Sequence, residues 1–230
     1  MPAMMVRQTP MRRDTGFLAR LGAVSTPFTI EVVSDVICPW CYIGKRRLGK
    51  ALAALAGETS AEIRWLPFQL NPTMPAEGIP RAEYRVRKFG SLERSRELDA
   101  RVAKEGKSEG ITFAFERIQR TPNTVAAHAL VGLAQQQGLA DPVVDALFRA
   151  YFEEAQDIGD TETLAAIAQR CGVSGLPRQE SATEVVALDQ QMRGLGISGV
   201  PTFILARRLA VSGAQAPETL IEAIREASSR

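Results

Sequence analysis

Two cysteines separated by two residues are the part of this chain whose types and spacing most directly allow chemistry. They belong to the run Cys38-Pro39-Trp40-Cys41. A thiolate is the nucleophile of thiol–disulfide exchange, and a second thiol three positions away is close enough to resolve the mixed disulfide that forms. The pair therefore predicts a redox centre in which Cys38 attacks and Cys41 resolves.

The segments on either side of the pair are those that such a centre requires. Residues 28–33 are rich in β-branched side chains and predict a strand, and from Tyr42 onward apolar residues follow helical spacing. Cys38 is then expected at a helix N-terminus, where unpaired N–H groups and the helix dipole favour an anion. Thiol pKa values in such motifs fall to about 3.5–7.5 from about 8.5. The run Lys45-Arg46-Arg47 either adds positive charge near Cys38 or forms a solvated helix face.

A zinc site and a structural disulfide are less favoured interpretations of the cysteine pair. A structural zinc site usually needs four ligands, and the remaining soft ligands, Cys171 and His128, stand far apart in the sequence. We therefore expect no metal. A purely structural disulfide would close a very short loop and gain little from chain entropy. Cys171 ends an amphipathic segment and is expected to behave as a small buried hydrophobe, with a redox role as the alternative.

Composition excludes some functions and indicates a location. Hydrophobic residues make up 45% of the 230 residues, and the formal net charge of +2 gives no reason to expect nucleic acid. No apolar stretch approaches the ~20 residues of a membrane span. Residues 1–27 are rich in arginine with one acidic residue, Asp14, and their short apolar stretch is interrupted by Arg20. We expect a disordered tail or a start codon placed too early, and hence a cytoplasmic protein; an export signal is the alternative.

The order of predicted elements is β-α-β, a helical block, then β-β-α. Residues 61–66 alternate like a strand, prolines interrupt residues 67–80, and residues 81–194 are almost wholly helical in pattern. Within this block, Asp160 and Asp141 are expected to cap the N-termini of two helices. Late strands are predicted at 202–205 and 209–211, and a final helix follows from residue 217. An α/β fold results, with the helical block over one end of a single sheet.

A second candidate site segment leads into the third strand. This is Ser198-Gly199-Val200-Pro201-Thr202-Phe203, in which proline suits a strand start. From the dipeptide alone we would expect a trans Val200-Pro201 bond, because cis occurs in only about 5–6% of X–Pro bonds.

Together, Cys38-Pro39-Trp40-Cys41, the helical block and the segment at Val200-Pro201 resemble the DsbA-like branch of the thioredoxin superfamily, most closely its FrnE-type subgroup. The resemblance covers about residues 28–226. It implies a thioredoxin-like fold formed by residues 28–75 and 195–230, with a large all-helical insertion at residues 76–194. It also implies a cis Val200-Pro201 bond, and main-chain groups of Val200 that bind an extended substrate by strand addition.

The resemblance assigns Cys38 as the attacking and Cys41 as the resolving cysteine, with Pro39 and Trp40 as the dipeptide that tunes the redox potential. Periplasmic DsbA enzymes typically carry Pro-His there, so strong oxidase behaviour is not implied. Asp35 could accept a proton during exchange. A turn residue that bonds to nearby backbone is an equally good interpretation.

A related branch with the same architecture contains 2-hydroxychromene-2-carboxylate isomerases and kappa-class glutathione transferases, which typically have serine where this chain has Cys38. In that interpretation the cleft is lined by Asn71, Asn123 and His128, and glutathione is a co-substrate. The alternative is that these three residues have ordinary capping and packing roles. The predicted function is thiol–disulfide exchange on protein or small-molecule thiols, without a bound cofactor. The alternatives are a glutathione-dependent isomerase or transferase and a non-catalytic, chaperone-like binding module.

Overall fold

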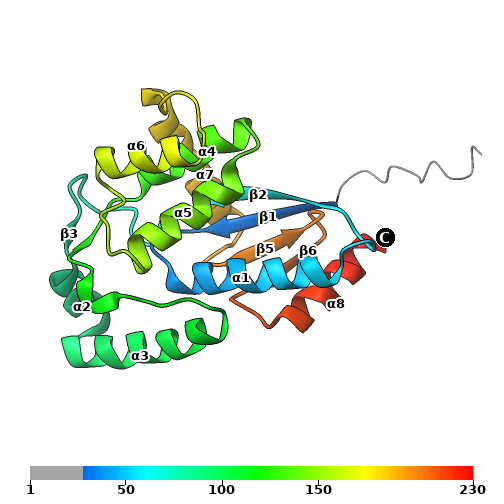
Figure 1. The fold of residues 1–230 in the computed structure, drawn as a ribbon, viewed down its shortest axis with the longest axis horizontal. Coiled ribbons are helices and arrows are strands. Elements are labelled where there is room, and N and C mark those ends of the chain that lie inside the picture. The colour runs from blue at the N-terminus through cyan, green and yellow to red at the C-terminus, as the bar shows by residue number, and fades with distance from the viewer. Residues whose placement is uncertain (1–27, 230) are drawn as a thin grey trace, which may run out of the picture.

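The computed structural model describes residues 28–229 (Figure 1). Its strands are β1 (Phe28–Ser34), β2 (Ala61–Pro67), β3 (Ile79–Pro80), β4 (Arg120–Thr121), β5 (Thr202–Leu205) and β6 (Leu209–Ser212). Its helices are α1 (Pro39–Ala54), α2 (Arg81–Phe89), α3 (Leu92–Ser108), α4 (Val125–Gln136), α5 (Ala140–Phe152), α6 (Thr161–Arg170), α7 (Gln179–Gly194) and α8 (Pro217–Ser228).

A four-stranded sheet in the order β2-β1-β5-β6 forms the centre of the fold. Strand β1 pairs in parallel with β2, as a β-α-β unit requires, and antiparallel with β5, which in turn pairs antiparallel with β6. The early unit and the late hairpin therefore share one sheet. The predicted α/β class and the thioredoxin-like arrangement are confirmed.

Alternation along the strands gives the sheet two different apolar faces. Ile30 and Val32 of β1 point to the face covered by α1 and α8, where they join the main core with Phe203 of β5. Val33, next in sequence, points to the opposite face and packs in a smaller cluster with Met192 of α7. Because side chains of a strand alternate, a strand that packs on both faces carries apolar residues on each of them, as β1 does.

Helices α2 to α6 gather around the end of the sheet where β1 ends and α1 begins (Figure 1). Aromatic side chains join this helical part to α1. The Tyr42 ring of α1 stacks on Phe148 of α5 at a centroid distance of 5.0 Å, and its hydroxyl donates to Glu153 at 2.5 Å. The division into residues 76–194 and the remainder stays a prediction. Helix α7, inside that range, contacts β2 of the central sheet.

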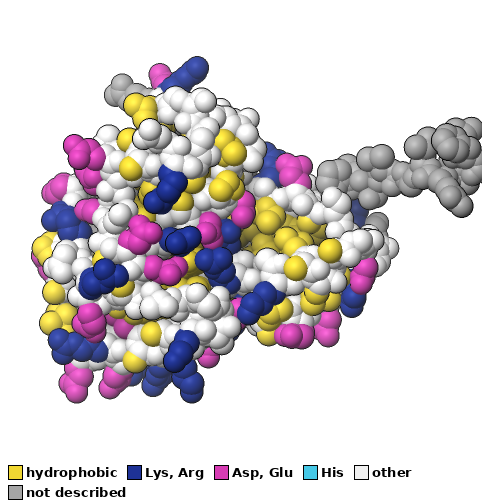
Figure 2. Space-filling model, in the orientation of Figure 1, with side chains coloured by type: hydrophobic (Ala, Val, Ile, Leu, Met, Phe, Trp, Pro, Cys, Tyr) yellow, Lys and Arg dark blue, Asp and Glu magenta, His cyan; other side chains and the backbone are white. Residues whose placement is uncertain are grey.

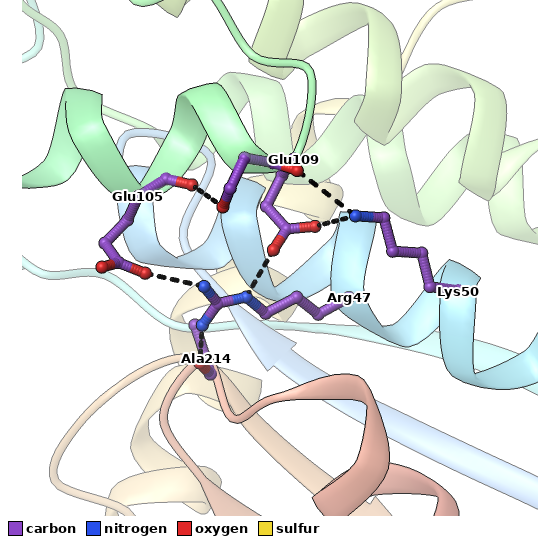
Figure 3. A network of polar contacts seen from close by, with 6 residues as sticks. Arg47, Lys50, Glu105, Glu109 and Ala214 are labelled. Atoms are coloured by element: carbon purple, nitrogen blue, oxygen red, sulfur yellow. Dashed lines mark hydrogen bonds and ion pairs between the residues drawn. The ribbon is translucent and has the colours of Figure 1, made fainter.

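A second connection is a polar network on the exposed side of α1 (Figure 3). Arg47 of α1 donates to Glu105 and Glu109 at 2.8 Å each, and to the Ala214 carbonyl at 2.7 Å. Lys50, one helical turn further on, lies 2.7 Å from Glu109. Arg47 thereby ties α3 and the loop before α8 to the same helix. The sequence predicts either charge for a thiolate or a solvated face at this position, and Arg47 instead links separate segments.

Some boundaries differ from the sequence-based expectation. Helix α1 begins at Pro39, directly after Cys38, where the sequence predicts the helix N-terminus, although the apolar helical spacing starts only at Tyr42. Asp160 caps α6 as predicted and accepts from Thr163 N at 2.9 Å. The predicted cap at Asp141 is wrong: α5 begins at Ala140, and the Asp141 carboxylate lies 3.1 Å from Lys45 Nζ of α1.

Three further observations complete the description of the fold. The predicted helical block contains one short strand pair, β3 with β4. None of the helices within residues 28–229 is long and apolar enough to cross a membrane.

On the face in Figure 2, positive and negative side chains are interspersed over the helical part, and hydrophobic side chains gather in a hollow between that part and α1.

Candidate active site at the start of helix α1

Cys38 occupies the N-cap position of α1, as the sequence predicts. Its backbone is extended, with φ −92° and ψ 113°, and its carbonyl accepts from Cys41 N at 3.0 Å and Tyr42 N at 3.3 Å. Pro39 follows at the first helical position, where a missing N–H costs no hydrogen bond. The Cys38 side chain therefore stands at the positive end of a 16-residue helix.

The two thiols of the pair lie in different surroundings. Both are free thiols, and both residues are buried, Cys38 with 5% and Cys41 with 2% of its surface exposed. Burial raises the pKa of the Cys41 thiol well above its ordinary value, and the neighbouring Cys38 raises it further. The Ser34 hydroxyl and the Asp35 backbone act in the opposite direction. Cys41 is thus held as a protonated thiol until its proton is removed.

The Val200-Pro201 peptide bond is cis and lies against the cysteine pair. The expectation of a cis bond, drawn from the family resemblance, is confirmed. The Cys38 sulfur lies 3.7 Å from the Val200 carbonyl oxygen, although 162 positions separate the two residues. Val200 is half-buried and Pro201 is buried. A main-chain carbonyl is therefore available beside the outer thiol.

Gly44 explains how the Pro201 ring can lie so close to α1. A Cβ atom at Gly44 would stand 2.9 Å from Pro201 Cγ and 3.2 Å from Phe203 Cζ. Glycine is unfavourable inside a helix, so its place here has a packing reason. The sequence carries one signal for this contact, a glycine within a helical pattern, but nothing in it identifies the partner.

Asp35 is fully buried at the end of β1, three residues before Cys38. One carboxylate oxygen accepts from Leu70 N at 2.7 Å, and the other accepts from Ile37 N at 3.4 Å. The second oxygen also lies 3.5 Å from His128 Nε2 of α4. The carboxylate therefore forms the local turn contact expected of such a residue, and it also connects the cysteine loop to the end of β2 and to the helical part.

The other proposed cleft residues take different places. The Asn123 side chain donates to the Met74 carbonyl at 2.8 Å and accepts from Val125 N at 2.9 Å, so both its polar atoms are used at the start of α4. The Asn71 side-chain nitrogen is buried and forms no hydrogen bond within residues 28–229. His128, by contrast, lies 3.5 Å from the Asp35 carboxylate.

Trp40, with 39% of its surface exposed, is the most exposed residue of the Cys38–Cys41 motif.

Ser34 belongs to the site, although the sequence does not predict it there. Its hydroxyl lies beside the Cys41 thiol and favours the thiolate. The position of a serine at the end of an apolar strand does not predict this contact, because the residue that faces the serine is fixed only when α1 packs onto β1.

Among the described residues, no three His, Cys, Asp or Glu side chains are grouped closely enough to hold a metal ion.

A thioredoxin-like sheet, a Cys-x-x-Cys pair at the start of its first long helix and a cis-proline segment against that pair are together typical of the thioredoxin-type oxidoreductases. The family model of the DSBA-like thioredoxin domain matches residues 29–225, and the chain belongs to that family. The family predicted from the sequence is confirmed.

The chain is also similar to individual proteins. The chain is 24% identical to the protein YwbO of Bacillus subtilis over 202 residues, 85% of this chain and 94% of YwbO. It is similar to the structure of a "probable DsbA oxidoreductase" from Streptomyces coelicolor, with 30% identity, a TM-score of 0.79 and coverage of 88% and 91% of the two chains. The cytosolic disulfide reductase DsbM from Pseudomonas aeruginosa, solved with GSH, shares the fold at 18% identity and a TM-score of 0.59, with coverage of 87% and 96%.

Proposed function

We propose that this protein is a thiol–disulfide oxidoreductase that exchanges disulfides through Cys38 and Cys41. The observation that carries the proposal is the position of the Cys38 sulfur, at a helix N-terminus and 3.7 Å from the Val200 carbonyl, with the Cys41 thiol buried behind it. The Cys38 thiolate attacks a substrate disulfide, and Cys41 then attacks the Cys38 sulfur of the mixed disulfide. Two electrons pass from the dithiol to the substrate, which leaves as two thiols.

The proposed substrates are protein or small-molecule disulfides and thiols that lie in extended form along the Val200-Pro201 segment. Main-chain groups of Val200 would give affinity without requiring particular side chains. Glutathione is the proposed small partner; the similar DsbM structure was solved with GSH. The cytoplasmic location stays a prediction, and fractionation of the producing cells tests it.

The test is turnover of a disulfide peptide with glutathione by the native protein and by Cys38→Ser, Cys41→Ser and Cys171→Ser. Cys38→Ser is expected to abolish turnover. Cys41→Ser is expected to lose turnover and, when glutathione is omitted, to stop after one stable mixed disulfide. Cys171→Ser serves as the matched control with full turnover. A Cys41→Ser protein that keeps full disulfide turnover would refute the cycling pair. A glutathione-dependent isomerisation that survives in Cys41→Ser would favour the isomerase. A Cys38→Ser protein that loses nothing while folded would favour a binding module.

A further inference from the structure

A pocket of about 420 Å³ lies between β2, α4 and α7, and neither Cys38 nor Val200 lines it. Its volume is within the range of small-molecule sites, about 300–1,000 Å³. Apolar residues from all three elements line it, among them Leu66, Leu133, Val185 and Leu188. The pocket is therefore separate from the place where a substrate disulfide would meet the Cys38 sulfur.

Several polar residues that line this pocket are buried and leave a side-chain atom without a hydrogen bond. Within residues 28–229 there are eight such buried atoms, and three of them, Ser34 Oγ, Trp65 Nε1 and His128 Nε2, belong to residues of the pocket. The Ser34 hydroxyl has the Cys41 thiol beside it, and His128 Nε2 has the Asp35 carboxylate at 3.5 Å. Trp65 Nε1, which can only donate, is thus the most clearly unpaired. Because a buried donor without an acceptor is costly, this atom indicates that the pocket takes a group with an oxygen acceptor.

The exposed residues that line the pocket carry an excess of positive charge. They include Arg64 of β2, Arg178 before α7 and Glu184 of α7, which is the one acidic residue of the lining. Among the described residues, neither arginine side chain has an ion-pair or hydrogen-bond partner. Arg193, also on α7, shows the contrast, because its guanidinium is paired with Asp189 at 3.0 Å. Two unpaired guanidinium groups at the opening favour a ligand with a negative charge.

We propose that this pocket binds a small organic carboxylate that has an apolar body and a second polar group at its inner end. The carboxylate lies at the opening, where it pairs with Arg64 and Arg178. The apolar body displaces water from the apolar lining, and the inner oxygen accepts a hydrogen bond from Trp65 Nε1. Binding involves no covalent step, and the site does not depend on the exchange function proposed for Cys38 and Cys41.

Trp65 fluorescence gives a test that reports from the pocket itself. The chain has two tryptophans, so Trp40→Phe in the full chain leaves Trp65 as the single reporter. The probes are hexanoate, octanoate and decanoate, the ω-hydroxy acid of each length, and octan-1-ol; calorimetry on the native chain gives the stoichiometry. We expect one acid per chain and about tenfold weaker binding of octan-1-ol than of octanoate. At one of the three lengths or more, the hydroxy acid should bind about threefold more tightly than the plain acid.

Charge variants test the opening of the pocket. Arg64→Gln and Arg178→Gln should each weaken octanoate binding about threefold and leave octan-1-ol binding unchanged. Arg149→Gln removes the same charge from an exposed arginine outside the pocket and should change neither.

A pair of glycine variants tests the space. Gly132 lines the pocket, is exposed, and has no atom within 4 Å of where its Cβ would be. Gly132→Leu should therefore narrow the pocket and weaken octanoate and octan-1-ol alike. Gly49→Leu makes the same change at an equally open, exposed helical glycine outside the pocket and should leave both unchanged.

Four results would overturn the proposal. If no acid changes Trp65 fluorescence or gives heat with the native chain, the site does not bind this class of ligand. Equal binding of octanoate and octan-1-ol would remove the role of the carboxylate, and tighter binding of the plain acid at every length would remove that of the inner polar group. Equal effects of Gly132→Leu and Gly49→Leu would place the binding elsewhere. If Gly132→Leu fails to fold, equal octanoate binding by Arg64→Gln and Arg149→Gln overturns the site instead.

Discussion

The contact between Gly44 and the cis-proline segment gives a prediction with a built-in comparison. In Gly44→Ala, the added Cβ stands 2.9 Å from Pro201 Cγ and 3.2 Å from Phe203 Cζ. A contact this short requires the ring or the helix to shift. Gly49 lies further along the same helix, and a Cβ there has no neighbour within 4 Å. Gly44→Ala and Gly49→Ala therefore have the same effect on helix propensity, but only Gly44→Ala places the new methyl group against other atoms.

The magnitudes follow from these two terms. Alanine is favoured over glycine in a helix interior by about 1 kcal/mol, so Gly49→Ala should raise the free energy of unfolding by about that amount. Overpacking of a filled site costs about 1–3 kcal/mol. Gly44→Ala should therefore range from neutral to about 2 kcal/mol less stable than the native protein. The two variants should differ by about 1–3 kcal/mol.

Urea unfolding of the reduced proteins measures these free energies. A second readout is the rate at which Cys38 reacts with Ellman's reagent, because Pro201 follows Val200, whose carbonyl faces the Cys38 sulfur at 3.7 Å. We expect this rate to change in Gly44→Ala and not in Gly49→Ala. Equal stabilisation of both variants, with equal rates, would show that the Gly44–Pro201 contact does not constrain the site.

Three further predictions concern stability and the third cysteine. Arg47→Met should cost about 2–4 kcal/mol in urea unfolding, because it leaves the Glu109 side chain, 6% exposed, with one cation fewer. Burial raises the pKa of Tyr151 from 10.0 to about 12, so the stability it contributes is complete below pH 10 and is lost as the pH rises to 12. Tyr151→Phe should flatten that part of the stability profile; an unchanged slope would contradict it. Cys171→Ser should leave peptide disulfide turnover unchanged, and a loss of turnover in the folded variant would give Cys171 a redox role.

The features predicted well from the sequence depend on neighbours close in the chain. The Asp160 cap needs only the N–H of Thr163, three residues on, and the strand at 28–33 needs only its own β-branched pattern. Cys38 at the helix start follows in the same way from the strand before it and the helix after it. The cis bond at Val200-Pro201 is predicted correctly for a different reason, since only the family resemblance indicates it.

The features that the sequence does not reveal depend on packing between distant segments. Asp141 has the sequence of a helix cap, but Lys45 of α1 lies 3.1 Å from its carboxylate in the folded chain, and the helix begins one residue before it. No local pattern could reveal that pairing across 96 positions. The Asp35–His128 contact is of the same kind, because α4 must first pack beside the sheet's edge to bring the imidazole there.

The division of labour that we propose for the two cysteines follows from their helix positions. Cys38 is the N-cap residue, so its sulfur meets the helix end and the Val200 carbonyl, where a substrate can approach. Cys41 is one turn inside, where the helix turns its side chain into the core and burial raises its pKa. A nucleophile at the helix end and a buried, protonated thiol one turn further on thus arise from a spacing of three residues at a helix start. The Ser34 hydroxyl and the Asp35 backbone act against the effect of burial, because both lower the pKa of the inner thiol.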